Sequence, residues 1–329
     1  MAENLLDVID LVTRFPTERG ELRAVDGVSF SLRRGEILSL VGESGCGKSM
    51  TALSIMRLVP PPGEIVSGQV LFEGRDLMSM DGERIRELRG DRISMVFQEP
   101  MSALNPVFTV GDQVAEVLRI HRKMDAKNAM EAALGILKRV GLPDPESRIT
   151  EYPHQMSGGM QQRILIAMAV ACEPAVLIAD EPTTALDVTV QAQILRLMEE
   201  IIRLGEGGAA LLITHDLGVV AEVADRVCVM YAGAILEKSP VRELFADPWH
   251  PYTMGLIRSL PTLKRREFHA IPGAVPDLAR LPGACRFHPR CPRAQGICGE
   301  KEPALLTTGE RSVRCHFPGA ENAGLRRSI

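Results

Sequence analysis

An eight-residue stretch, GESGCGKS from Gly42 to Ser49, constrains the fold of this chain more than any other feature. An apolar run from Ile37 to Val41 precedes it and predicts a buried strand, and the pattern from Met50 to Leu58 predicts a helix. The glycines in the stretch permit positive φ angles and a close approach of backbone to ligand. A turn of this kind directs bare amides outward from a helix N-terminus, so it predicts a phosphate site in an α/β sheet.

The pattern G-x-x-x-x-G-K-[ST] assigns chemical roles within the turn. Lys48 is expected to neutralise the β- and γ-phosphates of a nucleotide, and the Ser49 hydroxyl is expected to bind Mg²⁺. A chance match is the alternative, and the strand-turn-helix setting counts against it. The residues predicted to contact the nucleotide here are Gly42, Glu43, Ser44, Gly45, Cys46, Gly47, Lys48, Ser49 and Met50.

A second predicted strand, Ala175 to Ala179, runs into two carboxylates, Asp180 and Glu181. Open α/β sheets bind their ligands at the carboxyl ends of strands. Asp180 is therefore expected to hold Mg²⁺ with its water shell. Glu181 is expected to orient and deprotonate the attacking water, because phosphoryl transfer needs an in-line nucleophile. The alternative is that both carboxylates only cap the next helix.

The segment MSGGMQQR opens an apolar helix predicted from Met160 to Cys172, and its serine and glycines offer free amides to a second anion. Here the chain resembles the ATP-binding-cassette (ABC) family, whose signature is usually written LSGGQ. Met156 replaces the leucine with a side chain of similar volume, whereas Met160 lacks a side-chain donor. The residues expected to contact the anion are Ser157, Gly158 and Gly159.

The resemblance covers about the first 260 residues and implies further site residues. Gln98, after the strand predicted from Ile93 to Phe97, matches the glutamine that contacts Mg²⁺ and the attacking water. His215 matches the switch histidine at the γ-phosphate, and Asp187 matches the loop that crosses the dimer interface. Phe15 stands where the family places an aromatic ring on adenine, with core packing as an equally weighted alternative.

The family resemblance also implies a mechanism. Two cassettes are expected to face head to tail, so that the glycine loop of one and the Ser157 turn of the other bind a single ATP. Closure on ATP and opening after hydrolysis would be the work stroke. The implied catalytic residues are Glu181, His215 and Gln98, with Mg²⁺ held by Ser49, Gln98 and Asp180. A paralogous chain is the expected partner cassette, and self-pairing is the alternative.

Composition sets limits on what such a cassette could serve. The chain has 329 residues, 45% of them hydrophobic and 24% charged, which suits a large core and one smaller domain. Its longest apolar run, Ile164 to Cys172, is far shorter than the roughly 20 residues of a membrane span. The N-terminus lacks the features of a secretion signal, so a cytosolic location is expected.

Charge gives only a weak indication of partners. The net charge of −4 argues weakly against a nucleic-acid-binding protein. Residues 256–329 nevertheless hold 13 Lys and Arg against 6 Asp and Glu, and a solvated face is the simplest explanation of this surplus.

Four of the seven cysteines, Cys285, Cys291, Cys298 and Cys315, lie within 31 residues. In a reducing cytosol such a group favours a metal, with disulfides or idle thiols as the alternatives. Zinc and an iron–sulfur cluster both accept four thiolates, and His288 and His316 lie near enough to compete as zinc ligands.

Three segments resemble one branch of the family, the ATPases of dipeptide, oligopeptide and nickel importers. They are HPYTMGLIRSLP (250–261), IPGAVPDL (271–278) and CRFHPRCPRA (285–294). The resemblance implies a structural [4Fe–4S] cluster on the four cysteines, two transmembrane permease subunits and an extracytoplasmic binding protein that delivers the substrate. It places this chain at the cytoplasmic face of the inner membrane as a peripheral subunit.

Residues 110–140 carry two amphipathic helical patterns. In importers of this branch the helical subdomain forms a groove for a short cytoplasmic helix of the permease, and the exposed sequence near Gln98 is the expected docking surface. The alternative is that the two helices only pack on one another.

The sequence therefore predicts an α/β protein of two domains. Residues 1–260 are expected to form a P-loop NTPase cassette with a RecA-like core, an antiparallel β layer and a helical subdomain at about 100–172. Residues 261–329 are expected to form a small Cys-rich accessory domain, in which recurrent proline disfavours long helices.

The expected function is ATP hydrolysis that powers the uptake of dipeptides or oligopeptides. A soluble ABC ATPase acting on nucleic acid or ribosomes is the alternative, although such proteins usually carry two cassettes in one chain. Because the cassette does not touch the cargo, the sequence leaves nickel and glutathione open as substrates alongside peptides.

Overall fold

The computed structural model describes residues 4–18, 20–98, 103–183, 188–204, 208–260 and 270–319. Asp187 lies outside these residues, as do residues 99–102 in the expected docking surface near Gln98. Contacts between residues divide the chain into two compact units. The first contains residues 72–213 and two short stretches near the N-terminus, and the second contains residues 7–31, 38–71 and 214–329.

Three buried strands form the centre of the first unit: β6 (Ile93–Val96), β7 (Val176–Asp180) and β8 (Ala209–Thr214). β7 pairs in parallel with β6 and with β8. Every residue of the three strands is buried, as is typical of parallel strands covered on both faces. The strands predicted at 93–97 and 175–179 are confirmed to within one residue at each end.

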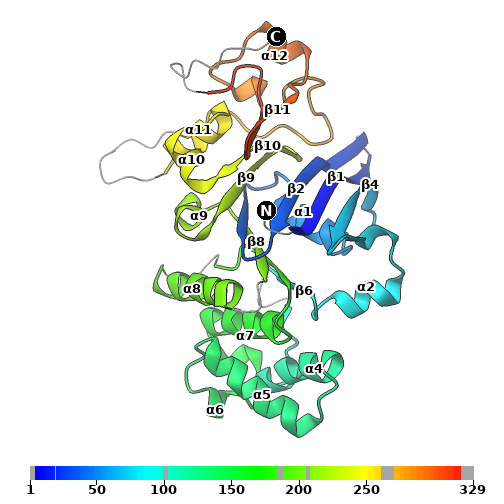
Figure 1. Cartoon of the computed structure of the whole chain (residues 1–329), viewed down its shortest axis with the longest axis vertical. Coiled ribbons are helices and arrows are strands. Elements are labelled where there is room, and N and C mark those ends of the chain that lie inside the picture. Colours follow the sequence, from blue (N-terminus) through cyan, green and yellow to red (C-terminus); the bar gives the residue numbers. More distant parts are fainter. Residues whose placement is uncertain are drawn as a thin grey trace. The chain divides into compact units, whose positions relative to one another are not determined.

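Helices make up the rest of the first unit. Three helices contact one another: α4 (Val110–His121), α5 (Ala126–Arg139) and α7 (Gly158–Val170). α7 also contacts α8 (Val188–Leu204) and β6 (Figure 1). Thr109 caps α4 and Asp125 caps α5, each by accepting a bond from a backbone amide of the first turn. The two amphipathic helices predicted in 110–140 are thus confirmed. The helices are α2 (Gly82–Leu88), α4 (Val110–His121), α5 (Ala126–Arg139), α6 (Pro145–Arg148), α7 (Gly158–Val170) and α8 (Val188–Leu204).

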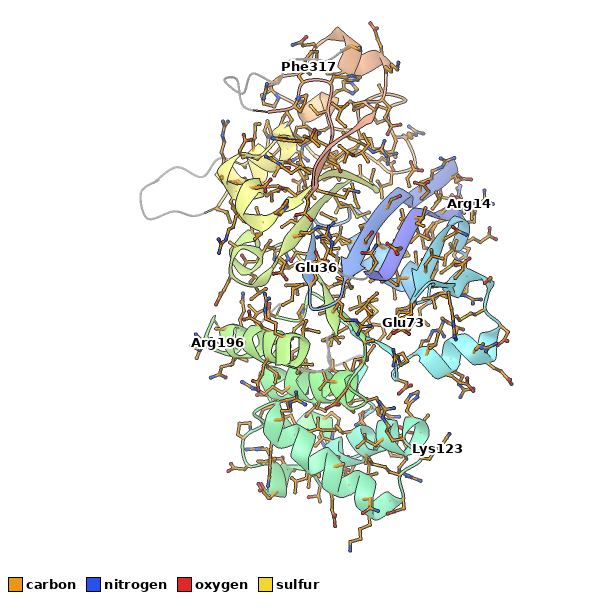
Figure 2. All side chains as sticks on the ribbon, in the orientation of Figure 1. Arg14, Glu36, Glu73, Lys123, Arg196 and Phe317 are labelled. Carbon is orange, nitrogen blue, oxygen red and sulfur yellow. The ribbon has the colours of Figure 1, made fainter. Side chains whose placement is uncertain are left out.

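Charged side chains mark the outer surface of this unit. Lys123, between α4 and α5, and Arg196, on α8, are both exposed (Figure 2). The short strand β5 (Arg75–Asp76) and the 3-10 turns η1 (Leu77–Ser79) and η2 (Pro153–Gln155) complete the first unit.

The second unit contains a β layer in the order β2 (Gly20–Arg33), β1 (Asn4–Thr17), β4 (Glu64–Phe72). Only two residues join β1 to β2, so these neighbouring strands run antiparallel. Buried positions in both strands, such as Leu11 and Val28, put apolar side chains on one face.

A second group of strands in this unit has the order β11 (Leu305–Thr308), β12 (Arg311–Arg314), β10 (Ala234–Pro240), β9 (Arg226–Tyr231), β3 (Ile37–Val41). β3 and β9 are parallel, and the other neighbours are antiparallel. The helices are α1 (Lys48–Ile55), α9 (Leu217–Val223), α10 (Val241–Ala246), α11 (Pro251–Arg258) and α12 (Gly296–Glu300), with a 3-10 turn η3 (His288–Arg290).

Residues 270–319 share a sheet and a core with the rest of the second unit. β12 pairs with β10, and Phe287 packs against Tyr231 and Tyr252 in one buried cluster. The described C-terminal residues therefore belong to the compact unit that also carries the glycine loop, and the domain boundary at residue 260 stays a prediction. Helices here are short, as the prolines predict.

None of the helices in the described residues is both long enough and apolar enough to cross a membrane.

Candidate nucleotide-binding site

The glycine loop joins β3 to α1, as the sequence predicts. Gly42 (φ +158°) and Gly47 (φ +107°) leave no room for a side chain. A Cβ on Gly42 would lie 2.2 Å from the Met230 carbonyl oxygen, and one on Gly47 would lie 2.2 Å from that of Ala24. Gly45 (φ +77°) instead faces open space. Close packing requires glycine at Gly42 and Gly47, and the backbone conformation requires it at Gly45.

Lys48 folds back over the loop. Its ammonium donates to the carbonyls of Gly42 (2.8 Å) and Glu43 (3.1 Å), and the side chain is buried. The amides of the loop stay at the N-terminus of α1, whose first residue is Lys48. This arrangement holds a positive charge beside the N–H groups of a helix N-terminus, as polyphosphate binding requires.

Cys46 lies within the loop and is fully buried, and burial raises the pKa of its thiol. Its backbone carbonyl accepts from the Gly233 amide at 2.9 Å. The Cys46 backbone therefore anchors the loop to the turn between Tyr231 and Ala234. Its buried thiol is not a reactive one.

The predicted catalytic carboxylates lie in the first unit at the end of β7. Asp180 is buried, and Glu181 has φ +47°, a conformation that non-glycine residues seldom adopt. The Glu181 amide donates to the Ile213 carbonyl on β8 at 2.9 Å, which holds this turn. Gln98 Nε2 donates to Glu181 Oε2 at 3.3 Å, so the structure brings these two predicted site residues together.

Ser157 caps α7, and its hydroxyl accepts from the Met160 amide at 3.4 Å. Ser157 and Gly158 are exposed, and a Cβ on Gly158 would meet nothing within 4 Å. Gln161 donates to the Pro153 carbonyl at 2.8 Å and fixes the turn from inside. The helix start is thus exposed at Ser157 and Gly158 and can receive a second molecule there.

Two further predicted site residues, His215 and Phe15, lie in the second unit. His215 is exposed directly after β8, where Asp216 caps α9. Phe15, on β1, is half-buried and its ring lies against Gly63. A Cβ at Gly63 would lie 2.4 Å from that ring, so Phe15 is packed on one side at least.

The four clustered cysteines all line one small cavity in the second unit, together with His288 and His316. All seven cysteines are free thiols, so the disulfide alternative is wrong for this structure. Burial raises the pKa of Cys315 to about 12. Nδ1 of His288 and Nε2 of His316 each lie 2.8 Å from a backbone carbonyl.

The predicted metal centre is not preformed. Among the described residues, no three or more His, Cys, Asp or Glu side chains are placed to hold a metal ion. The cavity between the cysteines measures about 10 Å³, room for one water molecule at most. The donor chemistry suits iron–sulfur or zinc, but the four thiols would have to be rearranged to hold either.

Sequence reasoning missed two residues that contact the loop. Tyr252 and Arg290 both bind Glu43, and they belong to the segments HPYTMGLIRSLP and CRFHPRCPRA, which carry the resemblance to the importer branch. An acidic residue inside a loop for polyphosphate is itself a signal that a cation must neutralise it.

A glycine loop between strand and helix, a strand that ends in two carboxylates and a Ser-Gly-Gly helix start together define a nucleotide-binding cassette. The family described as "ABC transporter" matches residues 25–184, and that described as "Oligopeptide/dipeptide transporter, C-terminal region" matches residues 236–298.

Relatives match nearly the whole chain. The probable peptide ABC transporter ATP-binding protein y4tR of Sinorhizobium fredii is 53% identical over 308 residues, 92% of each chain. The dipeptide transport ATP-binding protein DppD of Haemophilus influenzae is 47% identical, covering 95% of this chain and 96% of its own. The oligopeptide transport ATP-binding protein AppD of Bacillus subtilis is 49% identical, covering 97% and 98%.

Solved structures match as well. The ATP-binding cassette MJ0796, in a dimeric post-hydrolysis state bound to ADP and Pi, has a TM-score of 0.66 at 26% identity. The match covers 72% of this chain and 99% of that one. The chain belongs to the ABC transporter family, as a cassette ATPase. These relatives lend no support to the alternative of a factor acting on nucleic acid.

Proposed function

We propose that this chain is the ATP-hydrolysing subunit of an ABC importer that energises the uptake of dipeptides or oligopeptides. The observation that carries the proposal is the extent of the similarity to peptide-transport ATP-binding proteins. It runs through both the cassette and the C-terminal region, at 47 to 53% identity in the relatives named above.

Each residue of the site has a distinct task in this proposal. Lys48 exchanges part of its bonding to loop carbonyls for bonds to phosphate oxygens. Ser49, Asp180 and Gln98 carry the hard oxygen donors that Mg²⁺ prefers, and the ion would neutralise charge on the phosphates. Glu181 accepts a proton from the attacking water, and Gln98 holds Glu181 in position through its amide.

A head-to-tail pair of cassettes completes the proposal. Ser157 and Gly158 are exposed, and a Cβ on Gly158 would meet nothing within 4 Å, so a second cassette can present its nucleotide to this helix start. A paralogous chain is the proposed partner. His215, exposed after β8, is proposed to contact the γ-phosphate.

A permease is proposed to dock on the first unit. A groove of about 460 Å³ lies there, and Phe97 on its wall is 39% exposed. Met95, Phe97, Val117 and Leu165 make much of its wall apolar, which suits the apolar face of a short permease helix. The groove is lined by Gly90, Ser94, Met95, Phe97, Ala103, Val117, His121, Leu165, Met168 and Ala169. Docking there would place the chain at the cytoplasmic face of the membrane as a peripheral subunit.

Phe97→Glu tests the docking. We expect the purified variant to bind nucleotide normally but to fail to co-purify with permease subunits, because a charge would be buried in an apolar contact. Leu306→Glu is the matched control, since Leu306 is 48% exposed but lies in the other unit. Unchanged co-purification of the Phe97 variant would contradict the proposed surface.

Glu181→Gln tests the reaction. The change keeps shape and removes the base, so we expect phosphate release by the assembled complex to fall by about 100-fold to 10,000-fold while ATP binding persists. Glu131→Gln, on the exposed face of α5, is the control. Phosphate release at the wild-type rate would remove Glu181 as general base.

We further propose that the four cysteines ligate a [4Fe–4S] cluster, with Zn²⁺ as the alternative. Support comes from the shared cavity and from the absence of disulfides among them. The same four thiolates would hold either group, and the two differ in their content of iron and labile sulfide. Iron and sulfide analysis with a visible absorption spectrum distinguishes the two, and Cys298→Ser should lose the metal.

A further inference from the structure

Glu43, the second residue of the glycine loop, is held by two residues from much later in the chain. Arg290 makes a two-pronged ion pair with its carboxylate: Nη1 lies 2.6 Å from Oε2 and Nη2 lies 3.0 Å from Oε1. The Tyr252 hydroxyl accepts from the Glu43 backbone amide at 2.9 Å. Both the side chain and the main chain of this loop residue are therefore fixed by the C-terminal part of the second unit.

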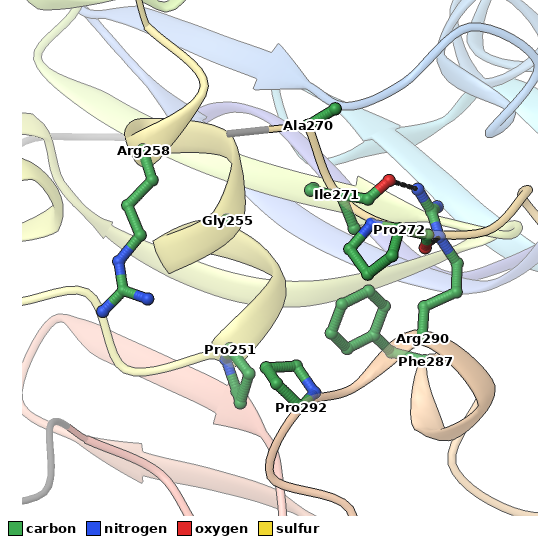
Figure 3. Close-up of a pocket in the computed structure, with 9 residues that line it drawn as sticks. All are labelled: Pro251, Gly255, Arg258, Ala270, Ile271, Pro272, Phe287, Arg290 and Pro292. Carbon is green, nitrogen blue, oxygen red and sulfur yellow. Dashed lines mark hydrogen bonds between the residues drawn. The ribbon is translucent and has the colours of Figure 1, made fainter. Parts of the chain in front are cut away.

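Arg290 is itself rigidly placed. Its Nε donates to the Pro272 carbonyl at 2.9 Å and its Nη2 to the Ile271 carbonyl at 3.3 Å (Figure 3). The side chain is only 4% exposed. Gly273 (φ +77°) lets the neighbouring backbone pass close, since a Cβ there would lie 3.3 Å from Arg290 Cγ. A buried guanidinium with its bonds satisfied in this way has little freedom to leave Glu43.

Tyr252 is equally constrained. Its ring packs at 4.7 Å from that of Tyr231 and 5.3 Å from that of Phe287, and it is fully buried. His250 caps α11 by accepting from the Tyr252 amide at 3.0 Å, which sets the direction of the first turn. The sequence His250-Pro251-Tyr252 thus places the Tyr252 hydroxyl beside the Glu43 amide.

Arg290 and Tyr252 together clamp Glu43, and this clamp acts on the loop backbone that binds Lys48. The carbonyls of Gly42 and Glu43 are the acceptors of the Lys48 ammonium, so any shift of Glu43 also shifts that lysine. Arg290 also cancels the negative charge of Glu43 beside a loop that binds a polyanion. Without Arg290, that carboxylate would repel the phosphates.

We infer that Arg290 and Tyr252 are positioning residues that hold Glu43, and with it the phosphate loop, in the conformation that binds ATP. The inference rests on the nucleotide-binding part of the proposed function and not on peptide transport. It gives the C-terminal region, including the His-Pro-Tyr motif, a direct part in nucleotide affinity.

The test uses the full-length chain, Mg²⁺ and the non-hydrolysable ATP analogue AMP-PNP, with Kd measured by calorimetry and Tm measured without nucleotide. Arg290→Met is expected to raise Kd by about tenfold, because an unpaired carboxylate is left beside the phosphates. Adding Glu43→Gln to that variant is expected to recover about threefold of the loss, since the repulsive charge disappears. A purely structural role would not give this rescue.

Arg311→Met is the matched control. Arg311 is another buried arginine of the C-terminal region, paired with Glu237 and Asp247 and stacked on Trp249, and no bond links it to the loop. The Arg311→Met substitution should lower Tm but leave Kd for AMP-PNP within about twofold of wild type. Arg290→Lys, which keeps the charge but not the fork, should raise Kd by about threefold and serves if Arg290→Met does not fold.

The inference is overturned if an Arg290 variant that folds binds AMP-PNP within about twofold of wild type, if Arg311→Met raises Kd equally, or if Glu43→Gln gives no rescue. Failure of the wild-type chain to bind the nucleotide would instead sink the proposed function, so the two failures are distinguishable.

Discussion

Gly47→Ala is the substitution whose cost the structure defines most closely. Gly47 has φ +107°, and an alanine there would carry about 1–2 kcal/mol of backbone strain. Its Cβ would also lie 2.2 Å from the Ala24 carbonyl oxygen and 2.7 Å from Met230 Cε. The methionine can move, but the carbonyl belongs to the β layer and cannot yield without disturbing it.

Relieving such an overlap in a packed interior costs about 1–3 kcal/mol, so the two effects together lower the free energy of unfolding by about 2–5 kcal/mol. Gly27→Ala is the control in the same unit. It has φ +68° with nothing within 4 Å of the added Cβ, so only the backbone strain of about 1–2 kcal/mol applies.

The assay is urea unfolding followed by the fluorescence of Trp249, the single tryptophan, which is buried in the unit that carries the loop. Gly47→Ala should unfold at a distinctly lower urea concentration than Gly27→Ala, and it should lose nucleotide binding. If the two variants differ by less than about 0.5 kcal/mol, the close contact with Ala24 does not constrain the loop and the reasoning is refuted.

Two further predictions concern pH and the helix start. His250 is buried, which lowers its pKa to about 3, so below pH 6.5 the unfolded chain takes up a proton that the folded chain refuses. Stability should therefore fall by about 2 kcal/mol between pH 6.5 and pH 5, and His250→Asn, which keeps a capping side chain, should abolish that loss in urea unfolding at the two pH values. Ser157→Ala should cost about 1 kcal/mol or less of stability, since its cap bond to Met160 is 3.4 Å long, but should lower ATPase activity of the assembled complex about tenfold or more. Equal activity in that complex would remove Ser157 from the site.

Local patterns allowed much of the site to be predicted. The strand before Gly42, the strand that ends at Asp180 and the helix start at Ser157 all depend on a few consecutive residues, because apolar runs, glycine turns and caps act over short distances. Each of these was confirmed in place. The helices at 110–121 and 126–139 followed from apolar spacing for the same reason.

What only the tertiary structure decided are the contacts between residues far apart in the chain. The bond from Gln98 to Glu181 and the clamp of Arg290 and Tyr252 on Glu43 join positions that no local spacing relates. The cysteines illustrate the same limit, since their spacing grouped them but could not show that they line one cavity without forming a ready metal site. Side-chain reach and packing set these distances, and both depend on how the whole unit closes around its core.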